Sequence, residues 1–403
     1  MSLRQWIAAS IVLLLFVLGY GLYFLICAKP PTPLAQQVYI WQRIWTPHHQ
    51  HALQQSHSLF SALRVLGLQI HPQEGIRHIA INNALLKQDG RPVWLVIRLD
   101  GQLAHLNPSL IIQQVQCTAH AWANAGIPLA GVEIDYDAPT AKLADYQQLV
   151  SALRKSLPQT LTLSITALPT WLESPLLPTL LHTADTSVLQ VHNVQSPANG
   201  LFDPHLAQRW VTEYASKTRH PFFVALPAYG SALTPDNRVE SEATLSYADQ
   251  EMQELSVAPQ TVADLMRQLE QQPPEGLQGF VWFRLPLAGD RLSWSMATLK
   301  AVIHHQPLVP RWSVIVTPTA DPMLFDLAIN NSGQIDAPLP EQVALQNVDC
   351  EFADGANHYR SELANNALHF TRINLQQLRA GESSPLGWAR CAKALQGKFD
   401  VAP

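Results

Sequence analysis

The sequence predicts a (β/α)8 TIM-like barrel that follows an N-terminal transmembrane helix and precedes a C-terminal β-sandwich-like domain. Three observations predict this organisation: an uncharged run near the start, eight alternations of strand and helix patterns, and short alternating runs beyond Pro310. A barrel of this class takes about 250 residues, so the 403-residue chain has room for a smaller domain. The expected boundaries are 1–28 for the anchor, 29–36 for a linker, 37–308 for the barrel and 309–403 for the β-domain.

The anchor is predicted from the run Trp6–Cys27, which contains no charged residue. A helix of that length spans about 33 Å, enough to cross a hydrocarbon core of about 30 Å. A cleavable signal peptide has a shorter apolar region and small residues at the cut, so we expect an uncleaved anchor and hence the membrane as a partner. The segment Lys29–Pro33 is a short stiff spacer. The few charges that flank the uncharged run favour a periplasmic or otherwise extracytoplasmic location for the bulk of the chain.

The barrel is predicted from eight β-rich runs with helical patterns between them. The expected strands are Val38–Gln42, Val65–His71, Val93–Leu99, Gly131–Asp137, Leu161–Thr166, Val188–Asn193, Phe222–Leu226 and Gly279–Arg284. The helical patterns include Ser109–Ala123 and Ala141–Leu157, whose apolar residues recur at helical spacing. The number and size of the units match a closed barrel. Because the second run is weak, a seven-stranded or open doubly wound sheet is the alternative.

The sequence pattern changes in the segment beyond Pro310. Its short alternating runs are separated by turn signals such as Asn330–Gly333, which predict antiparallel β-structure. Cys350 and Cys391 both lie in this segment, and we expect them to pair if it is in an oxidising compartment. We expect Cys117, on a helical pattern of the barrel, to be a buried free thiol.

Composition excludes one class of partner. The net charge is −5 and no basic run occurs, which argues against a nucleic-acid surface. Nothing in the sequence indicates a cofactor. Four histidines at 48, 49, 51 and 57 crowd the segment after the first strand, but structural zinc usually takes four well-spaced ligands and no cysteine is near. We therefore expect no metal site.

The stretch Leu129–Asp137, LAGVEIDYD, places three carboxylates within five residues. Side chains alternate along a strand, so Glu133, Asp135 and Asp137 share one face, about 7 Å apart per step. At the carboxyl end of a barrel strand, these acids reach the mouth where barrel enzymes act. Confined carboxylates cannot all ionise cheaply, so at least one is expected to have a raised pKa and to donate a proton near neutrality. Glycosidic cleavage needs such an acid beside a second carboxylate.

A family resemblance follows from these residues. The segment GVEIDYD, then LTLSITALPTW, with the opening VYIWQRIW and the closing GFVWFRLP, resembles a bacterial family of unknown function predicted to form glycosidase-like barrels. More remotely, the acid row resembles the DGxDxDxE signature of chitinase-like glycoside hydrolases of family eighteen. That resemblance implies roles for Asp137 as proton donor, Asp135 and Glu133 as its supports, and Trp282 as the floor of a sugar subsite.

Two residues depart from the remote signature. Ala130 stands where the signature has Asp, and Asp137 stands where the proton donor is Glu. The missing methylene would withdraw the carboxyl by about 1.5 Å, and catalysis is sensitive to displacements of that size. Catalysis by Asp137 would therefore require a rebuilt site.

Further residues are candidates for substrate binding because of their places at strand ends. They are Trp282, Arg98, His192, Asn193, Tyr229, Trp41 and Arg284. The competing hypothesis is an inert layer of salt bridges, in which Arg98, with help from Arg43 and Arg284, neutralises the acids. The acidic stretch Ser231–Val257 is long enough for a lid or a disordered loop.

We therefore expect a membrane-anchored, extracytoplasmic, glycoside-hydrolase-like protein that acts on a cell-envelope or extracellular polysaccharide. The first alternative is a glycan-binding or envelope assembly protein on a degenerate, non-catalytic barrel. The second is an envelope scaffold that uses an exposed apolar patch of the β-domain and has a blocked barrel mouth. The state of Asp137 separates these readings, because a hydrolase needs that carboxyl free and a degenerate barrel pairs it with arginine.

Overall fold

The computed structural model describes residues 33–192, 200–233, 239–240, 253–395 and 399–402. The chain divides into two units, Met1–Leu34 and Ala35–Pro403, and the second contains every described strand and helix. The expected transmembrane helix lies outside the described residues, as does Asn193. Within the part of the chain that is described, no helix has the length and apolar character needed to cross a membrane.

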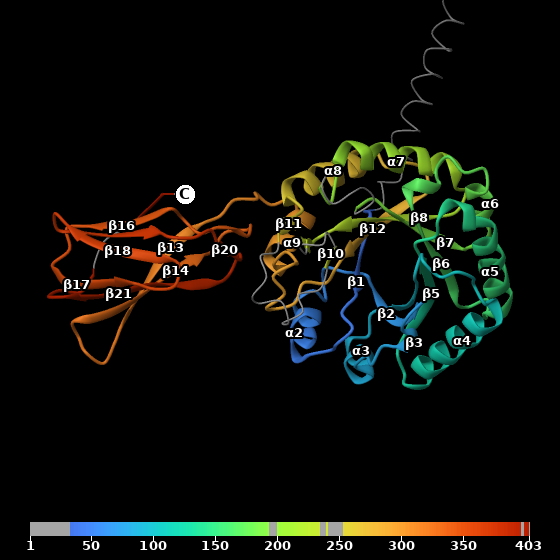
Figure 1. The fold of residues 1–403 in the computed structure, drawn as a ribbon, viewed down its shortest axis with the longest axis horizontal. Helices are drawn as coiled ribbons and strands as arrows, with labels where there is room; N and C mark the ends of the chain where they lie inside the picture. The colour runs from blue at the N-terminus through green and yellow to red at the C-terminus, as the bar shows by residue number, and fades with distance from the viewer. Residues whose placement is uncertain (1–32, 193–199, 234–238, 241–252, 396–398, 403) are drawn as a thin grey trace, which may run out of the picture. The chain divides into compact units, whose positions relative to one another are not determined.

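Eight parallel strands close into a barrel (Figure 1). They are β1 (Ala35–Ile40), β2 (Ala62–His71), β4 (Val93–Leu99), β5 (Leu129–Tyr136), β6 (Thr162–Ala167), β7 (Thr186–Gln190), β8 (Phe222–Pro227) and β12 (Leu277–Phe283). Strand β1 pairs with both β12 and β2, which closes the ring. The prediction of an eight-stranded barrel is confirmed, and the seven-stranded and open-sheet alternatives are wrong. A short strand β3 (Gly75–His78) pairs antiparallel with β2.

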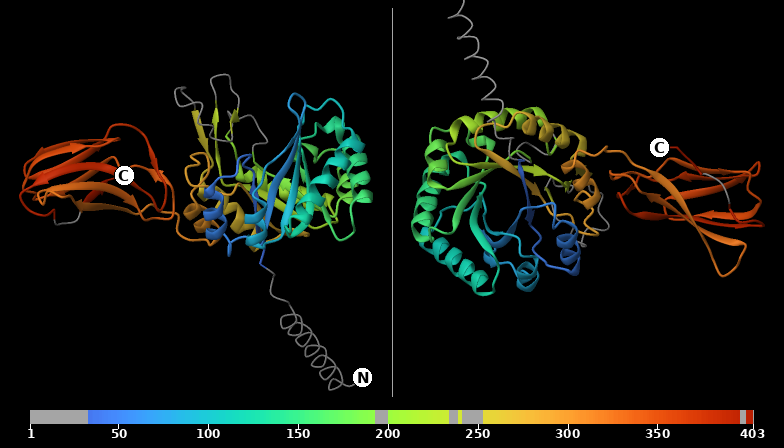
Figure 2. Two further views of the ribbon diagram at one scale, coloured as in Figure 1. Left: turned by 90° about the horizontal axis from the view of Figure 1, so that it is seen from below. Right: turned by 180° about the vertical axis from the view of Figure 1, so that it is seen from behind.

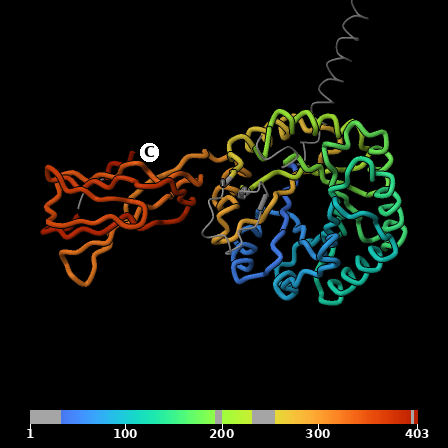
Figure 3. Tube along the Cα trace, in the orientation of Figure 1, coloured from blue at the N-terminus to red at the C-terminus, as the bar shows by residue number. Residues whose placement is uncertain are grey.

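Helices surround the strands, and the chain passes round the barrel in sequence order (Figure 3). The helices are α2 (Pro47–Gln55), α3 (Asn83–Asp89), α4 (Pro108–Asn124), α5 (Leu143–Ser156), α6 (Leu177–Thr183), α7 (Pro204–Lys217), α8 (Pro259–Gln271) and α9 (Met296–Ile303), with 3₁₀ turns at Thr140–Lys142 and Pro169–Trp171. Several start at a capping side chain: Asn82, Asn107, Asp203 and Ser295 each accept a hydrogen bond from a backbone N–H of the first turn. The apolar face expected for α5 is buried.

Strand β5 alternates as its sequence predicts. Val132, Ile134 and Tyr136 face the helices, and the Tyr136 ring contacts the Tyr146 ring of α5 at 5.2 Å between centroids. The Tyr146 hydroxyl donates to the carbonyl oxygen of Ile134 at 3.1 Å. The acids of β5 therefore point into the barrel, because successive side chains take opposite faces.

A small antiparallel sheet follows β8. It consists of β9 (Gly230–Leu233), β10 (Val239–Glu240) and β11 (Gln253–Ser256), in the order β10-β9-β11, and stands at one end of the barrel (Figure 2). The stretch Ser231–Val257, expected to be a lid or a disordered loop, contains these three short strands apart from Gly230. Its residues 234–238 and 241–252 lie outside the described residues.

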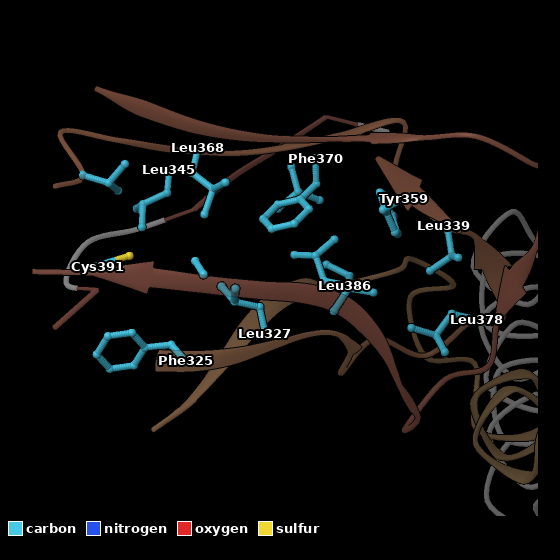
Figure 4. Packing of buried hydrophobic residues seen from close by; sticks show 14 residues of the cluster. Phe325, Leu327, Leu339, Leu345, Tyr359, Leu368, Phe370, Leu378, Leu386 and Cys391 are labelled. Carbon is cyan, nitrogen blue, oxygen red and sulfur yellow. The ribbon is translucent and has the colours of Figure 1, made fainter. Parts of the chain in front are cut away.

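The segment after α9 is antiparallel β-structure, as predicted. Its strands are β13 (Trp312–Pro318), β14 (Leu324–Asn331), β15 (Ala337–Pro338), β16 (Gln342–Gln346), β17 (Cys350–Gly355), β18 (Tyr359–Ala364), β19 (Ala367–Arg372), β20 (Gln377–Leu378), β21 (Ser383–Cys391) and β22 (Asp400–Ala402). They form two four-stranded sheets, β13-β14-β21-β17 and β18-β19-β16-β22, and the pair β15-β20. Side chains from both four-stranded sheets share one hydrophobic cluster (Figure 4).

A disulfide joins β17 to β21. Cys350 and Cys391 are register partners in the two strands and are bonded, which confirms the expected pairing. Cys117 is a free cysteine but lies exposed on α4, so the expectation that it is buried is wrong. The helix turns that position toward solvent, while its neighbours Val115 and Ala119 face the core.

Removing the disulfide should destabilise the β-domain. In the double substitution Cys350→Ser and Cys391→Ser, the free energy of unfolding should fall by roughly 2–4 kcal/mol, because the unfolded chain regains the freedom of the closed loop. Hydrogen exchange of peptides from 309–403 should show the loss of protection. Cys117→Ser is the matched control and should leave exchange unchanged. Equal protection with and without the disulfide would contradict the expectation.

Candidate functional site

A pocket of about 320 Å³ lies at the carboxyl ends of the barrel strands. It is lined by residues at or just after the ends of β4, β5, β6, β7 and β12, as represented by Arg98, Asp135, Thr166, Gln190 and Phe283. This is the end of a parallel barrel at which strand-end side chains converge. The described residues therefore leave a pocket at the mouth, which differs from the blocked mouth expected of an envelope scaffold.

Arg98 bridges two acids of the row. Its Nη1 donates to Asp135 Oδ2 at 2.7 Å, and its Nη2 donates to Asp137 Oδ2. The geometry follows from register, because Arg98 and Asp135 are partners in the parallel pair β4–β5. Asp137 is thus paired with arginine, as the degenerate-barrel reading expects. The pairing is incomplete, because Asp137 Oδ1 is buried and has no hydrogen-bond partner among the described residues.

The two bridged carboxylates differ in environment. Asp135 is 4% exposed, whereas the Asp137 side chain is 37% exposed. Burial raises the pKa of Asp135 to about 6, although Arg98 opposes the rise. Asp135 is therefore a carboxyl that exchanges a proton near neutrality.

Glu133 lies one layer deeper, as predicted, and does not line the pocket. It is fully buried and accepts hydrogen bonds from Tyr39 Oη at 2.6 Å and Ser164 Oγ at 2.9 Å, together with an ion pair from Arg64 Nη1. The Arg64 guanidinium lies 4.5 Å from the centroid of the Trp94 ring. Glu133 is therefore a supporting residue of the barrel interior, and its cation, Arg64, was missed by the sequence analysis.

Glycine at 131 makes room for this layer. A Cβ atom at that position would lie 2.4 Å from the Trp94 ring, closer than real contacts allow. The Gly131 position that matches the remote signature thus has a local packing reason. It allows the indole to lie against Arg64 beneath the acid row.

His192 and Thr166 add unpaired polar atoms to the pocket. His192 follows β7, is 3% exposed, and its Nδ1 lies 3.2 Å from Tyr229 Oη. Its Nε2 and Thr166 Oγ1 are buried without hydrogen-bond partners among the described residues. Burial lowers the pKa of His192 to about 3, so the imidazole is neutral at physiological pH. Both His192 and Tyr229, which the sequence predicted as binding residues, line the pocket.

Aromatic rings form one wall of the pocket. Phe283 lies at the centre, with ring centroids 5.2 Å from Trp41, 5.3 Å from Tyr229 and 5.8 Å from Tyr39. Trp41, expected at the mouth from the first strand, is therefore in place. Phe283 was not among the sequence candidates.

The predicted place of Trp282 on the floor of the pocket is wrong. Trp282 is 0% exposed and does not line the pocket; its Nε1 donates to Gln36 Oε1 at 2.7 Å on the outer face of the barrel. A one-residue difference on a strand reverses the side chain's face, so Phe283 takes the inward position expected for Trp282.

The predicted place of Arg284 in the pocket lining is also wrong. Arg284 is buried and pairs with Asp290 at 2.7 Å, away from the pocket lining. The residue follows the end of β12, where the chain leaves the strand alternation on which its predicted position depended. Arg284 is therefore a buried partner of Asp290 and not a residue of the pocket lining.

The described residues hold no group of three or more His, Cys, Asp or Glu side chains arranged for a metal ion. Of the histidines expected to crowd the first loop, His49 is buried and stacks on Trp45 at 4.6 Å between centroids. Burial lowers the pKa of His49 to about 4. This histidine is a packed residue.

The fold is a closed (β/α)8 barrel with a pocket at its mouth and an acid row on β5, the fourth of its parallel strands. Residues 89–288 match the family described as Domain of unknown function (DUF3142), so the barrel carries a DUF3142 domain. Residues 314–392 match a second family, Domain of unknown function (DUF8456). The expected resemblance to a domain-of-unknown-function family is confirmed. No curated protein matches the chain.

Solved structures with a similar fold include a spore cortex-lytic enzyme and chitinases. The spore cortex-lytic enzyme SleL of Bacillus megaterium is 13% identical, with a TM-score of 0.47, over 64% of this chain and 72% of that one. A chitinase from Bacteroides thetaiotaomicron is 9% identical, with a TM-score of 0.48, over 63% and 90%. The chitinase ChiB of Flavobacterium johnsoniae is 15% identical, with a TM-score of 0.45, over 68% and 93%. All three TM-scores lie below 0.5.

Arg64 should be a strong determinant of barrel stability. Arg64→Met leaves the buried Glu133 carboxylate without its cation, so the free energy of unfolding should fall by about 3–5 kcal/mol. The measurement is denaturant unfolding followed by tryptophan fluorescence. Arg267→Met is the control, because its pair with Asp264 is exposed and should contribute less than about 1 kcal/mol. Equal losses in the two variants would show that the buried pair is unimportant.

Arg98 should hold down the pKa of Asp135. In Arg98→Gln, that pKa should rise above its value of about 6, because burial would then act unopposed. Because the folded-state pKa exceeds the ordinary 3.8, ionisation of Asp135 costs stability as the pH rises through about 6. A ¹³C titration of the aspartate carboxyls measures the change, with Arg267→Gln as control. An unchanged or lower pKa in Arg98→Gln would be incompatible with this account.

Proposed function

We propose that the barrel mouth binds a saccharide unit of a cell-envelope or extracellular glycan. The observation that carries this proposal is one pocket that combines an aromatic wall with buried polar atoms lacking partners. The wall is Phe283, Trp41 and Tyr39; the unpaired atoms belong to Asp137, Thr166 and His192. A sugar ring presents an apolar face to aromatic rings and hydroxyls to such atoms. The pocket volume suits a small ligand group.

Each side chain has a defined role in this proposal. Phe283 and Trp41 supply the surface on which the ring rests. Asp137 Oδ1 accepts a hydrogen bond from the ligand, and the neutral His192 ring contributes its free Nε2. Arg98 keeps Asp137 in position, so it is a positioning residue. The site is preformed, because Arg98 of β4 holds Asp137 and Tyr229, after β8, holds His192.

Hydrolysis of the bound glycan is the second candidate function. The observation that favours it is the pKa of about 6 for Asp135, which lets a carboxyl donate a proton near neutrality. Arg98 pairs with both carboxylates, so the assignment of the donor rests on the burial that raises the pKa of Asp135. If cleavage occurs, Asp135 is therefore the better donor and Asp137 the charge-stabilising carboxylate, which reverses the assignment implied by the remote signature.

We also propose that the protein is anchored in a membrane by the uncharged N-terminal run, with the barrel and a β-sandwich-like domain in an extracytoplasmic or periplasmic compartment. The Cys350–Cys391 disulfide supports the compartment, because disulfides persist in oxidising surroundings and are rare in the cytosol. Such a location would bring the barrel mouth to envelope or extracellular glycans.

Glycan binding should depend on Phe283. In Phe283→Ala, affinity for whichever polysaccharide binds the full chain, from a panel of amino-sugar and neutral glycans, should fall by roughly tenfold as the ring loses its aromatic contact. Binding is followed by titration and reducing ends in parallel. Trp388→Ala removes an exposed aromatic of β21, outside the pocket, and is the matched control.

The outcomes separate the two functions. Binding without new reducing ends supports the binding protein. Reducing ends that fall by about 10²–10⁴-fold in Asp135→Asn support hydrolysis. Binding by no glycan in the panel, or equal loss in Phe283→Ala and Trp388→Ala, would overturn a glycan site at the mouth.

A further inference from the structure

In the inner part of the pocket, carboxylates outnumber guanidinium groups. A single guanidinium, that of Arg98, serves the two carboxylates Asp135 and Asp137. The third carboxylate, Asp100, lies 3.7 Å from His71 Nε2. Arg43 is exposed at the rim and makes no ion pair with any described carboxylate. When Asp135 and Asp137 are both ionised, at a pH above about 6, the inner part of the pocket therefore has one negative charge more than Arg98 offsets.

The inner part of the pocket also has an unserved hydrogen-bond acceptor, while the donors of its arginine are engaged. Both Nη atoms of Arg98 already donate to carboxylates. Asp137 Oδ1 is a buried acceptor that no described group serves. His192, 3% exposed and with Nε2 unpaired, lines the same space and stays uncharged. Apart from Arg43 at the exposed rim, the described residues of the pocket therefore offer no free cationic donor to Asp137, and a ligand ammonium supplies one with three N–H groups.

The aromatic wall suits the same ligand. The rings of Phe283, Trp41 and Tyr39 are arranged edge to face, with centroids 5.2–5.9 Å apart. Aromatic faces attract cations as well as apolar C–H groups. A ring that carries an amine would therefore meet favourable surfaces on both sides of the pocket.

Resting on the glycan function proposed above, we infer that the pocket takes a saccharide with a free amino group, whose ammonium pairs with Asp137 while its ring lies against Phe283. An N-acetylated or neutral sugar leaves the extra carboxylate charge uncompensated. An acidic sugar adds negative charge beside Asp137 and finds the donors of Arg98 already engaged.

The test compares two oligosaccharides of equal length, one of N-acetylglucosamine and one of glucosamine, titrated into the full chain at a pH above about 6, where Asp135 is ionised, and below the pKa of the amine. The glucosamine oligomer should bind about tenfold more tightly, and added salt should reduce the difference. In Asp137→Asn, which keeps the shape and removes the charge, the preference should disappear. Asp137→Ser provides a second variant if the first does not fold.

The control is Asp264→Asn, on an exposed helix face remote from the pocket lining. It should retain the preference, which excludes attraction by net protein charge alone. Equal or tighter binding of the acetylated oligomer, lost in Phe283→Ala, would overturn this inference and leave the glycan site standing. A preference that survives Asp137→Asn would overturn the assigned contact. Binding of neither oligomer would count against both proposals.

Discussion

Three carboxylates on one face of β5 can lie inside a barrel only if cations and hydrogen-bond donors accompany them, because an unpaired buried charge is costly. The barrel meets this constraint in two layers. Arg64, Tyr39 and Ser164 satisfy Glu133 completely in the lower layer. In the upper layer, Arg98 alone is shared by Asp135 and Asp137. The lower layer is structural, and the unequal upper layer is where the barrel opens to a ligand.

This division reconciles two readings that the sequence left as competitors. An inert salt-bridge layer accounts for Glu133 and for one oxygen of Asp137. It does not account for the pocket above them, whose wall is aromatic and whose polar atoms on Asp137, Thr166 and His192 have no partners among the described residues. Exposed apolar side chains also occur beyond Pro310, including Phe352 and Trp388. The open mouth nevertheless favours a ligand site over a scaffold that works through the β-domain alone.

The strand count, the inward face of β5, the β-rich C-terminal segment and the disulfide could be predicted because they depend on local periodicity and chain position. The pairing of Arg98 was foreseen because it lies on the strand preceding β5. Arg64 was missed because the expected second strand began at Val65, one residue too late, which hid an inward arginine. The inward position was assigned to Trp282 instead of Phe283, because only the register of β12 decides which of two adjacent aromatics faces inward. The Arg284 pair with Asp290 forms beyond the strand, where periodicity gives no guidance.

The most direct measurement of the account is a crystal structure of the chain soaked with an amino-sugar oligosaccharide. The account predicts a sugar ring against Phe283 and Trp41, with a polar group of the ligand within hydrogen-bonding distance of Asp137 Oδ1 and with Arg98 still bridging Asp135 and Asp137. Sugar bound only on another surface, such as the exposed face near Trp388, with the mouth occupied by solvent, would contradict it.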